Sequence, residues 1–169
     1  FFSYVMDGFA FAGEALCGKH YGAGEMGQLQ ATTRRLMAFG MAMVVVFTAT
    51  YVLWGTEIVQ LMTSDAAVVE ASRGYLFWAY LIPLAGVAAF VYDGVFIGMT
   101  QTRAMLLTTL TAAVVFFCVN MGCSCLGRCR VGFLATNPNH ILWLAYILFL
   151  ATRGLVQSIL YRRILAKLS

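Results

Sequence analysis

A single carboxylate, Asp93, lies within a long apolar run of the sequence, residues 75–100. As a helix rising about 1.5 Å per residue, this run is long enough to cross a hydrocarbon core about 30 Å thick. An aspartate at the middle of a spanning helix costs about 2.5–3.5 kcal/mol, so such residues normally face protein or water and serve transport, proton relay or counter-ion pairing. Asp93 is therefore the first functional candidate. The structural alternative is a buried carboxyl that only hydrogen-bonds a neighbouring helix.

Two further acidic residues, Asp7 and Glu14, lie seven residues apart in the first apolar segment. Seven residues are about two helical turns, so both carboxylates project from one face together with Phe11. This face is polar within an otherwise apolar segment, which makes both carboxylates candidates for a cavity. The small residues at positions 8, 12, 13, 15 and 18 predict close packing against another helix, and packing alone is the favoured interpretation of the glycines.

A basic residue, Arg153, lies in the middle of the last apolar segment. Asp7, Asp93 and Arg153 each precede the first basic residue at the same end of their segments by about nine to twelve positions, or about 14–18 Å of helix, which places them at similar depth. Arginine does not lose its charge, so if the helices are neighbours it can pair with one carboxylate while the others remain protonatable. Left unpaired, these charges would together cost on the order of 10 kcal/mol. We therefore expect pairing or neutralisation.

The apolar run around Asp93 also contains Pro83 and Gly86. A proline inside a helix frees a backbone carbonyl one turn earlier and bends the helix. Near a carboxylate in a membrane, such a bend commonly shapes a cavity or a hinge. We expect a hinge at Pro83 and Gly86, and a static kink is an equally good alternative.

The composition of the whole chain is that of an integral membrane protein. Of its 169 residues, 62% are hydrophobic and only 11% are charged, whereas soluble domains carry about 25% charged residues. The apolar segments show no alternation with period two, so an all-α bundle is expected rather than a barrel. We predict five transmembrane helices, at about residues 1–18, 36–54, 75–100, 104–121 and 141–161.

The positions of the basic residues predict the orientation of the spans. Under the positive-inside rule, the ends richest in lysine and arginine face the cytoplasm, and this places the C-terminus there. Because the net charge of +4 arises mainly at helix ends, it indicates topology and not nucleic-acid binding. The expected inner ends carry Lys19, Arg34, Arg35, Arg103, Arg162, Arg163 and Lys167, and the outer loops carry Arg73, Arg128 and Arg130.

A cysteine cluster, Cys123, Cys125 and Cys129, precedes His140. Its spacing fits no common zinc finger or knuckle, so we expect no metal site. A disulfide is chemically feasible if the loop lies outside, but the pairing cannot be deduced. The sequence also offers no nucleophile–base pair, so we do not expect an enzyme.

At these residues the chain resembles the multidrug and toxic compound extrusion (MATE) transporters, specifically their DinF-like branch. The resemblance spans nearly the whole chain in consistent order and spacing. The matching stretches are SYVMDGFAFAGEAL (3–16) with Gly18, GAG (22–24), PL (83–84), DGVFIG (93–98), TR (102–103), NH (139–140), LWLA (142–145) and RGL (153–155). The chain departs from the family pattern where Gly-Asn-His-Gly-Leu-Trp is usual and PNHILW (138–143) stands here.

The resemblance implies twelve helices in two six-helix lobes around a central cavity, and this chain resembles helices 8–12 of the C-terminal lobe. The first lobe and helix seven are expected to be missing from it. Asp93 corresponds to the acidic position of helix ten that is linked to cation coupling. Asp7, Glu14 and Arg153 match positions typical of the branch, and Tyr92 is included among the candidate cavity residues.

The resemblance also implies a function for the parent protein, a secondary active antiporter of the cell (inner) membrane. It would export amphipathic or cationic organic compounds in exchange for H⁺ or Na⁺, with no cofactor beyond this coupling ion. Its expected partners are the lipid bilayer, small organic substrates and the N-terminal lobe of the same protein. Two alternatives remain, a flippase for a lipid-linked precursor and a non-transporting fragment. The mostly acidic candidate cavity argues against the flippase, which would favour a basic cavity for pyrophosphate.

Overall fold

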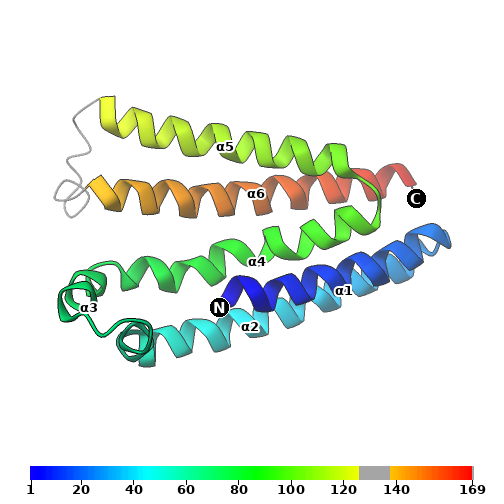
Figure 1. The fold of residues 1–169 in the computed structure, drawn as a ribbon. Helices are drawn as coiled ribbons and strands as arrows, with labels where there is room; N and C mark the ends of the chain where they lie inside the picture. Colours follow the sequence, from blue (N-terminus) through cyan, green and yellow to red (C-terminus); the bar gives the residue numbers. More distant parts are fainter. Residues whose placement is uncertain (126–137, 169) are drawn as a thin grey trace.

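The apolar segments form helices, which satisfy their backbone hydrogen bonds without help from water. The computed structural model describes residues 1–125 and 138–168 (Figure 1). Within these residues the helices are, in chain order, α1 (Phe2–Gly22), α2 (Met26–Met62), α3 (Ala66–Arg73), α4 (Leu76–Gly98), α5 (Thr102–Cys125) and α6 (Pro138–Leu168).

The helix that carries Asp93, α4, is the centre of the packing. It packs against α1, α2 and α6, whereas α5 packs chiefly against α6 (Figure 1). On α4, Val87, Val91 and Val95 are buried at intervals of four residues and so form one stripe along the helix. This stripe joins a core cluster that includes Phe2 and Met6 of α1. The site on α4 therefore rests on the most extensively packed helix.

Glycines allow α1 and α4 to approach closely. A Cβ atom at Gly94 would collide with the backbone of Ala10, and one at Gly98 would lie 2.6 Å from the Glu14 carbonyl oxygen. A Cβ atom at Gly18 would lie 3.3 Å from the carbonyl oxygen of Gly98. Small residues four apart are a common basis for close contact between spanning helices. The close packing predicted for the small residues of α1 is confirmed at Gly13 and Gly18, but it is wrong at Gly8, where a Cβ atom would meet nothing within 4 Å.

Four of the described helices, α2, α4, α5 and α6, are long and apolar enough to cross a membrane. Five spans were predicted, and α1 is not among these four. With 21 residues it has a spanning length, but every stretch of 18 residues within it contains Asp7, Glu14 and Lys19. The all-helical fold and its apolar helices identify an all-α, multi-pass membrane protein.

The turn between α1 and α2 is shorter than predicted. The first two predicted spans leave residues 19–35 between them, but only residues 23–25 lie outside a helix. In this turn Gly24 has φ +72°, which glycine adopts without strain, and His20 Nδ1 lies 2.9 Å from Glu25 Oε2. Hydropathy predicts where an apolar span ends, but the helix continues because the residues beyond that point include good helix formers such as Gln, Ala and Arg.

The second helix also extends past the predicted end of its span at residue 54. α2 continues to Met62 through a kink at Trp54, whose φ of −127° and ψ of 19° are not helical. The short helix α3 begins with Asp65 as its N-cap. An Asp65 carboxylate oxygen accepts a hydrogen bond from the backbone N–H of Ala67 over 2.8 Å.

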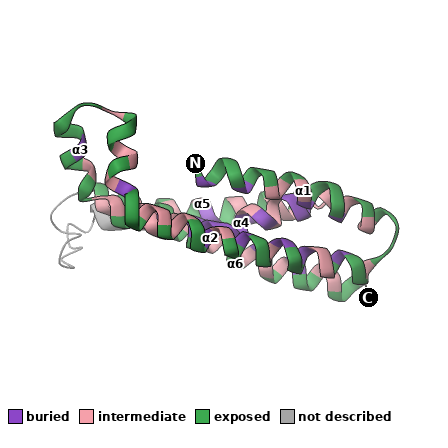
Figure 2. Ribbon diagram, turned by 90° about the horizontal axis from the view of Figure 1, so that it is seen from below, coloured by how far each residue is buried: buried purple, intermediate pink, exposed green. Residues whose placement is uncertain are grey.

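The outward faces of the helices are rich in exposed apolar side chains. Figure 2 shows buried residues between the helices and exposed ones on their outer faces. The exposed set includes Val45 and Leu53 on α2 and Leu107 and Val114 on α5. Lipid tails are as apolar as these side chains, so in a bilayer this exposure carries no cost.

Candidate functional site

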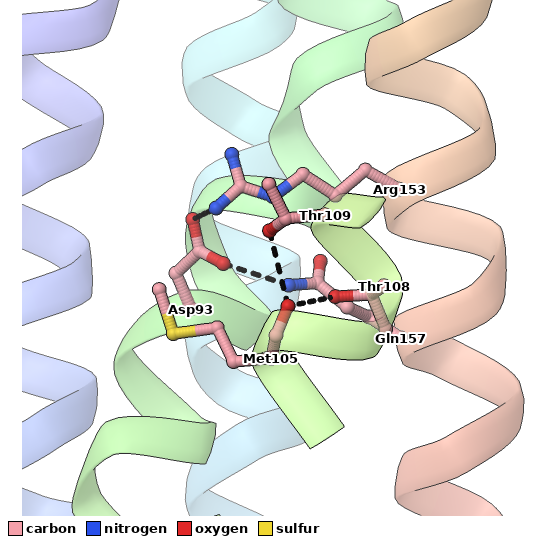
Figure 3. Close-up of polar contacts among 6 residues, drawn as sticks. All are labelled: Asp93, Met105, Thr108, Thr109, Arg153 and Gln157. Carbon is pink, nitrogen blue, oxygen red and sulfur yellow. Dashed lines mark hydrogen bonds and ion pairs between the residues drawn. The ribbon is translucent and has the colours of Figure 1, made fainter. Parts of the chain in front are cut away.

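The carboxylate of Asp93 is held by two side chains of α6 (Figure 3). Arg153 Nη2 donates a hydrogen bond to Asp93 Oδ2 over 2.7 Å, and the two groups form an ion pair. Gln157 Nε2 donates a hydrogen bond to Asp93 Oδ1, also over 2.7 Å. The side chains of Asp93 and Arg153 are only 17% and 19% exposed. Each carboxylate oxygen thus accepts a short hydrogen bond that favours its negative charge.

The local sequence of α6 explains why both donors reach Asp93. Arg153 and Gln157 are four residues apart, so they lie one turn apart on the same face of the helix. Gly154 lets this face approach α4, because a Cβ atom there would lie only 2.9 Å from the Cβ atom of Ala88. Since α4 and α6 are neighbours, Asp93 and Arg153, which the sequence placed at similar depth, meet.

Gln157, which is fully buried, was not among the residues predicted from the sequence. Its Oε1 atom, like the Nε atom of Arg153, has no hydrogen-bond partner among the residues that the structure describes. The signal that could have found it is its spacing of four from Arg153, which places both on one face. The described hydrogen bond of the Gln157 amide group is therefore the one that it donates to Asp93.

Polar side chains of α5 lie beside this cluster (Figure 3). The hydroxyl groups of Thr108 and Thr109 both donate hydrogen bonds to the Met105 carbonyl oxygen, over 2.8 and 3.0 Å. Their protons are thus used within α5, as is common for threonine in helices. Neither hydroxyl group therefore donates its proton to the Asp93 cluster.

The structure leaves the acidic residues of α1 outside the hydrogen-bonded cluster. Asp7 and Glu14 are exposed, and neither forms an ion pair or hydrogen bond with another described residue. The charge of Asp7 nevertheless lies near enough to act electrostatically on Asp93. Of the four charged candidates, Asp93 and Arg153 form an ion pair, whereas Asp7 and Glu14 on α1 have no such partner among the described residues.

The other predicted residues lie elsewhere on α4. Tyr92 packs against Tyr161 of α6, with ring centroids 5.3 Å apart, and lines a cavity whose lining does not include Asp93. Pro83 and Gly86 are buried, and α4 is assigned as one helix through both. Their role as a hinge stays a prediction.

The cysteine cluster lies largely beyond the described structure. Cys129 falls outside the described residues, and the side chains of Cys123 and Cys125 at the end of α5 are not described. Within residues 1–125 and 138–168, no three His, Cys, Asp or Glu side chains are grouped so as to hold a metal ion. His140 instead accepts a hydrogen bond at Nδ1 from Trp78 Nε1 over 3.0 Å.

Comparisons with known proteins agree with the resemblance seen in the sequence. The profile of the MatE family matches residues 1–121. The chain is 34% identical to DNA damage-inducible protein F of Escherichia coli (strain K12) over 163 residues, which are 96% of this chain and 33% of that protein. The chain thus spans about a third of the length of this curated relative. No solved structure gives a significant match. Because the family profile covers well over half of the chain, the chain belongs to the multidrug and toxic compound extrusion (MATE) family.

Proposed function

We propose that the intact protein is a secondary active antiporter that exports amphipathic or cationic organic compounds in exchange for H⁺ or Na⁺. The chain is then part of the C-terminal lobe, corresponds to helices 8–12 of a twelve-helix transporter and spans the membrane five times. In this proposal α1 supplies the fifth span, since its 21 residues are long enough for a core about 30 Å thick. Membership of the MATE family supports a transport function.

The observation that carries this proposal is the ion pair between Asp93 and Arg153 within two apolar helices. Arg153 keeps its charge and so acts as a tethered cation on the carboxylate. A proton or Na⁺ that binds Asp93 competes with the guanidinium group, and its binding frees Arg153. Binding of the ion to Asp93 therefore changes the contact that joins α4 to α6. A ligand shifts a conformational equilibrium only if it binds the two conformations with different affinity, and an ion that competes with Arg153 favours the conformation in which this contact is broken.

The exposed face of α1 supports both the substrate class and the N-terminal lobe as a partner. Tyr4, Asp7, Phe11 and Glu14 recur at helical spacing on this face, and all are exposed. Carboxylates that face lipid cost several kcal/mol each, so we infer that this face lines a water-filled cavity shared with the second lobe. Aromatic rings and carboxylates both attract organic cations, which fits an amphipathic cationic substrate.

The distribution of basic residues supports the proposed orientation. Lys19 lies near the end of α1, and Arg162 lies near the end of α6. Arg34 and Arg103 lie near the starts of α2 and α5. These four helix ends lie together on one side of the bundle (Figure 1). Under the positive-inside rule this side faces the cytoplasm. We propose the cell (inner) membrane as the location, with the C-terminus cytoplasmic.

The test is ion-driven efflux by the intact protein in proteoliposomes, with ethidium as the transported cation and H⁺ or Na⁺ gradients imposed separately. We expect Asp93→Asn to abolish the response to the coupling ion, because asparagine cannot ionise, while the protein still inserts into the membrane. Glu57→Gln is the matched control, since Glu57 is exposed on α2 and forms no ion pair with a described residue. Ion-driven efflux retained by Asp93→Asn would refute the assignment.

A further inference from the structure

A polar cavity of about 400 Å³ lies between α2, α4 and α6, and its lining does not include Asp93, Arg153 or Gln157. Arg34 projects into it from α2 and Arg162 from α6, and none of the lining residues is acidic. Its volume falls in the range of about 300–1,000 Å³ that is typical of small-molecule sites. Two guanidinium groups without a carboxylate favour an anionic ligand.

Hydrogen bonds fix the buried wall of this cavity. Tyr161 donates a hydrogen bond from its hydroxyl group to Thr33 Oγ1 over 3.0 Å, and Thr33 Oγ1 donates to the Leu29 carbonyl oxygen over 2.9 Å. Tyr161 and Thr33 are 7% and 4% exposed, and the ring of Tyr92 packs against that of Tyr161. The hydrogen bond between Tyr161 and Thr33 links α6 to α2, and Arg34 and Arg162 each directly follow one of these two residues.

The charges of the two arginines are not neutralised by other described residues. Arg34 and Arg162 are exposed, and neither forms an ion pair or hydrogen bond within residues 1–125 and 138–168. Two cations that face one cavity repel each other, and an anion bound between them attracts both and offsets this repulsion. The planar guanidinium group matches the geometry of phosphate oxygens and donates two parallel hydrogen bonds to them.

The cavity lies at the depth expected for lipid headgroups. The apolar segments predicted from the sequence begin at residue 36 in α2 and end at residue 161 in α6, so Arg34 and Arg162 stand just outside them. Met37 and Leu165 also line the cavity and supply an apolar side. A ligand that fits has a phosphate at one end and an apolar body at the other.

We propose that this cavity binds the headgroup of an anionic phospholipid, with its phosphate between Arg34 and Arg162. The lipid comes from the leaflet that borders the basic ends of the helices. Basic pockets between spanning helices bind anionic headgroups in this way. Met37 and Leu165 favour a lipid over free phosphate, which has no apolar part. Such binding requires membrane insertion but not transport, so it stands or falls separately from the antiport proposal.

The test is native mass spectrometry of the intact protein in detergent with equal amounts of phosphatidylglycerol and phosphatidylcholine of matched acyl chains. We expect preferential retention of phosphatidylglycerol, and about a tenfold loss of its affinity in Arg34→Gln/Arg162→Gln. The control is Arg35→Gln/Arg163→Gln, which removes the same charge from neighbouring residues that do not line the cavity. The control is expected to change the affinity less than twofold.

Three outcomes would overturn the proposal. Equal losses in the two double variants would show diffuse surface attraction instead of a site. Equal retention of the two lipids by the unchanged protein would show no selection for a net negative headgroup. Displacement of the lipid by inorganic phosphate at comparable concentration would show a site for free phosphate. If Arg34→Gln/Arg162→Gln fails to fold, the single variants Arg34→Gln and Arg162→Gln take its place, each with an expected loss of about threefold.

Discussion

Arg153 Nη2 lies 2.7 Å from Asp93 Oδ2 and joins α6 to α4 by an ion pair that is mostly shielded from solvent. A second arginine–carboxylate pair, Arg73 with Glu70 in α3, has its atoms 3.4 Å apart and side chains 54% and 74% exposed. Two unit charges 4 Å apart attract by about 1 kcal/mol in water and by about 4 kcal/mol at an effective dielectric constant near 20. The chain thus contains both a shielded and an exposed version of the same interaction.

We predict a double-mutant cycle with favourable coupling for the shielded pair. Asp93→Asn and Arg153→Gln each leave one charge without its partner, whereas the double variant removes both charges. The double variant is therefore expected to be less destabilised than the sum of the single variants, by about 1–3 kcal/mol. Thermal unfolding of the intact protein in detergent measures the coupling. The control cycle, Arg73→Gln with Glu70→Gln, is expected to give less than about 0.5 kcal/mol, because exposed pairs contribute little. Equal coupling in both cycles would contradict the prediction.

Gln157 is predicted to stabilise the protein through its hydrogen bond to Asp93. Gln157→Leu keeps a similar volume but removes the donor to Oδ1, so we expect the free energy of unfolding to fall by about 1–3 kcal/mol. Gln60→Leu is the control, because Gln60 is exposed on α2 and its change is expected to stay within about 0.5 kcal/mol. Denaturation of the two variants side by side measures the difference. A loss in Gln157→Leu no larger than in the control would show that this hydrogen bond contributes nothing.

The charged part of the site could be predicted from the sequence because a charge in an apolar run stands out from its surroundings. Asp93 and Arg153 were found in this way, and counting residues from the basic ends placed them at the same depth. The pairing itself depends on α4 and α6 being neighbours, which no count within one helix can establish. Gln157 was missed because an uncharged amide near the polar end of a helix does not stand out from its neighbours as a charge in an apolar run does.

The helices were predicted better than their ends. Apolar runs located α2, α4, α5 and α6, but the helices continue into polar residues at several ends, because helix formation needs no lipid. The kink at Trp54 could not be predicted from a proline, because α2 contains none. Conversely, α4 continues as one helix through Pro83. The close approach at Gly94 depends on which helix lies opposite, and only the three-dimensional structure shows this.

Tyr161 is predicted to link α6 to α2 by its hydroxyl group. Tyr161→Phe removes the hydrogen bond to Thr33 and keeps the ring against Tyr92. A typical hydrogen bond contributes about 0.5–1.5 kcal/mol, so we expect a loss of about 1 kcal/mol in the free energy of unfolding. Tyr146→Phe on the same helix is the control, since Tyr146 is 38% exposed. Indistinguishable unfolding midpoints for the two variants would argue against a structural role for the hydroxyl group of Tyr161.

The contact between α1 and α4 predicts opposite behaviour for two glycines in this pair of helices. In Gly94→Ala the new methyl group meets the backbone of Ala10, which can yield only if the helices separate, so we expect a destabilisation of about 1–3 kcal/mol. At Gly8 a Cβ atom meets nothing within 4 Å, and alanine is the better helix former, so Gly8→Ala is expected to be neutral or slightly stabilising. Thermal unfolding of both variants in detergent measures the contrast. A stable Gly94→Ala variant would mean that α1 rests on α4 less closely than the structure has it, and the nearness of Asp7 to Asp93 would then lose its support.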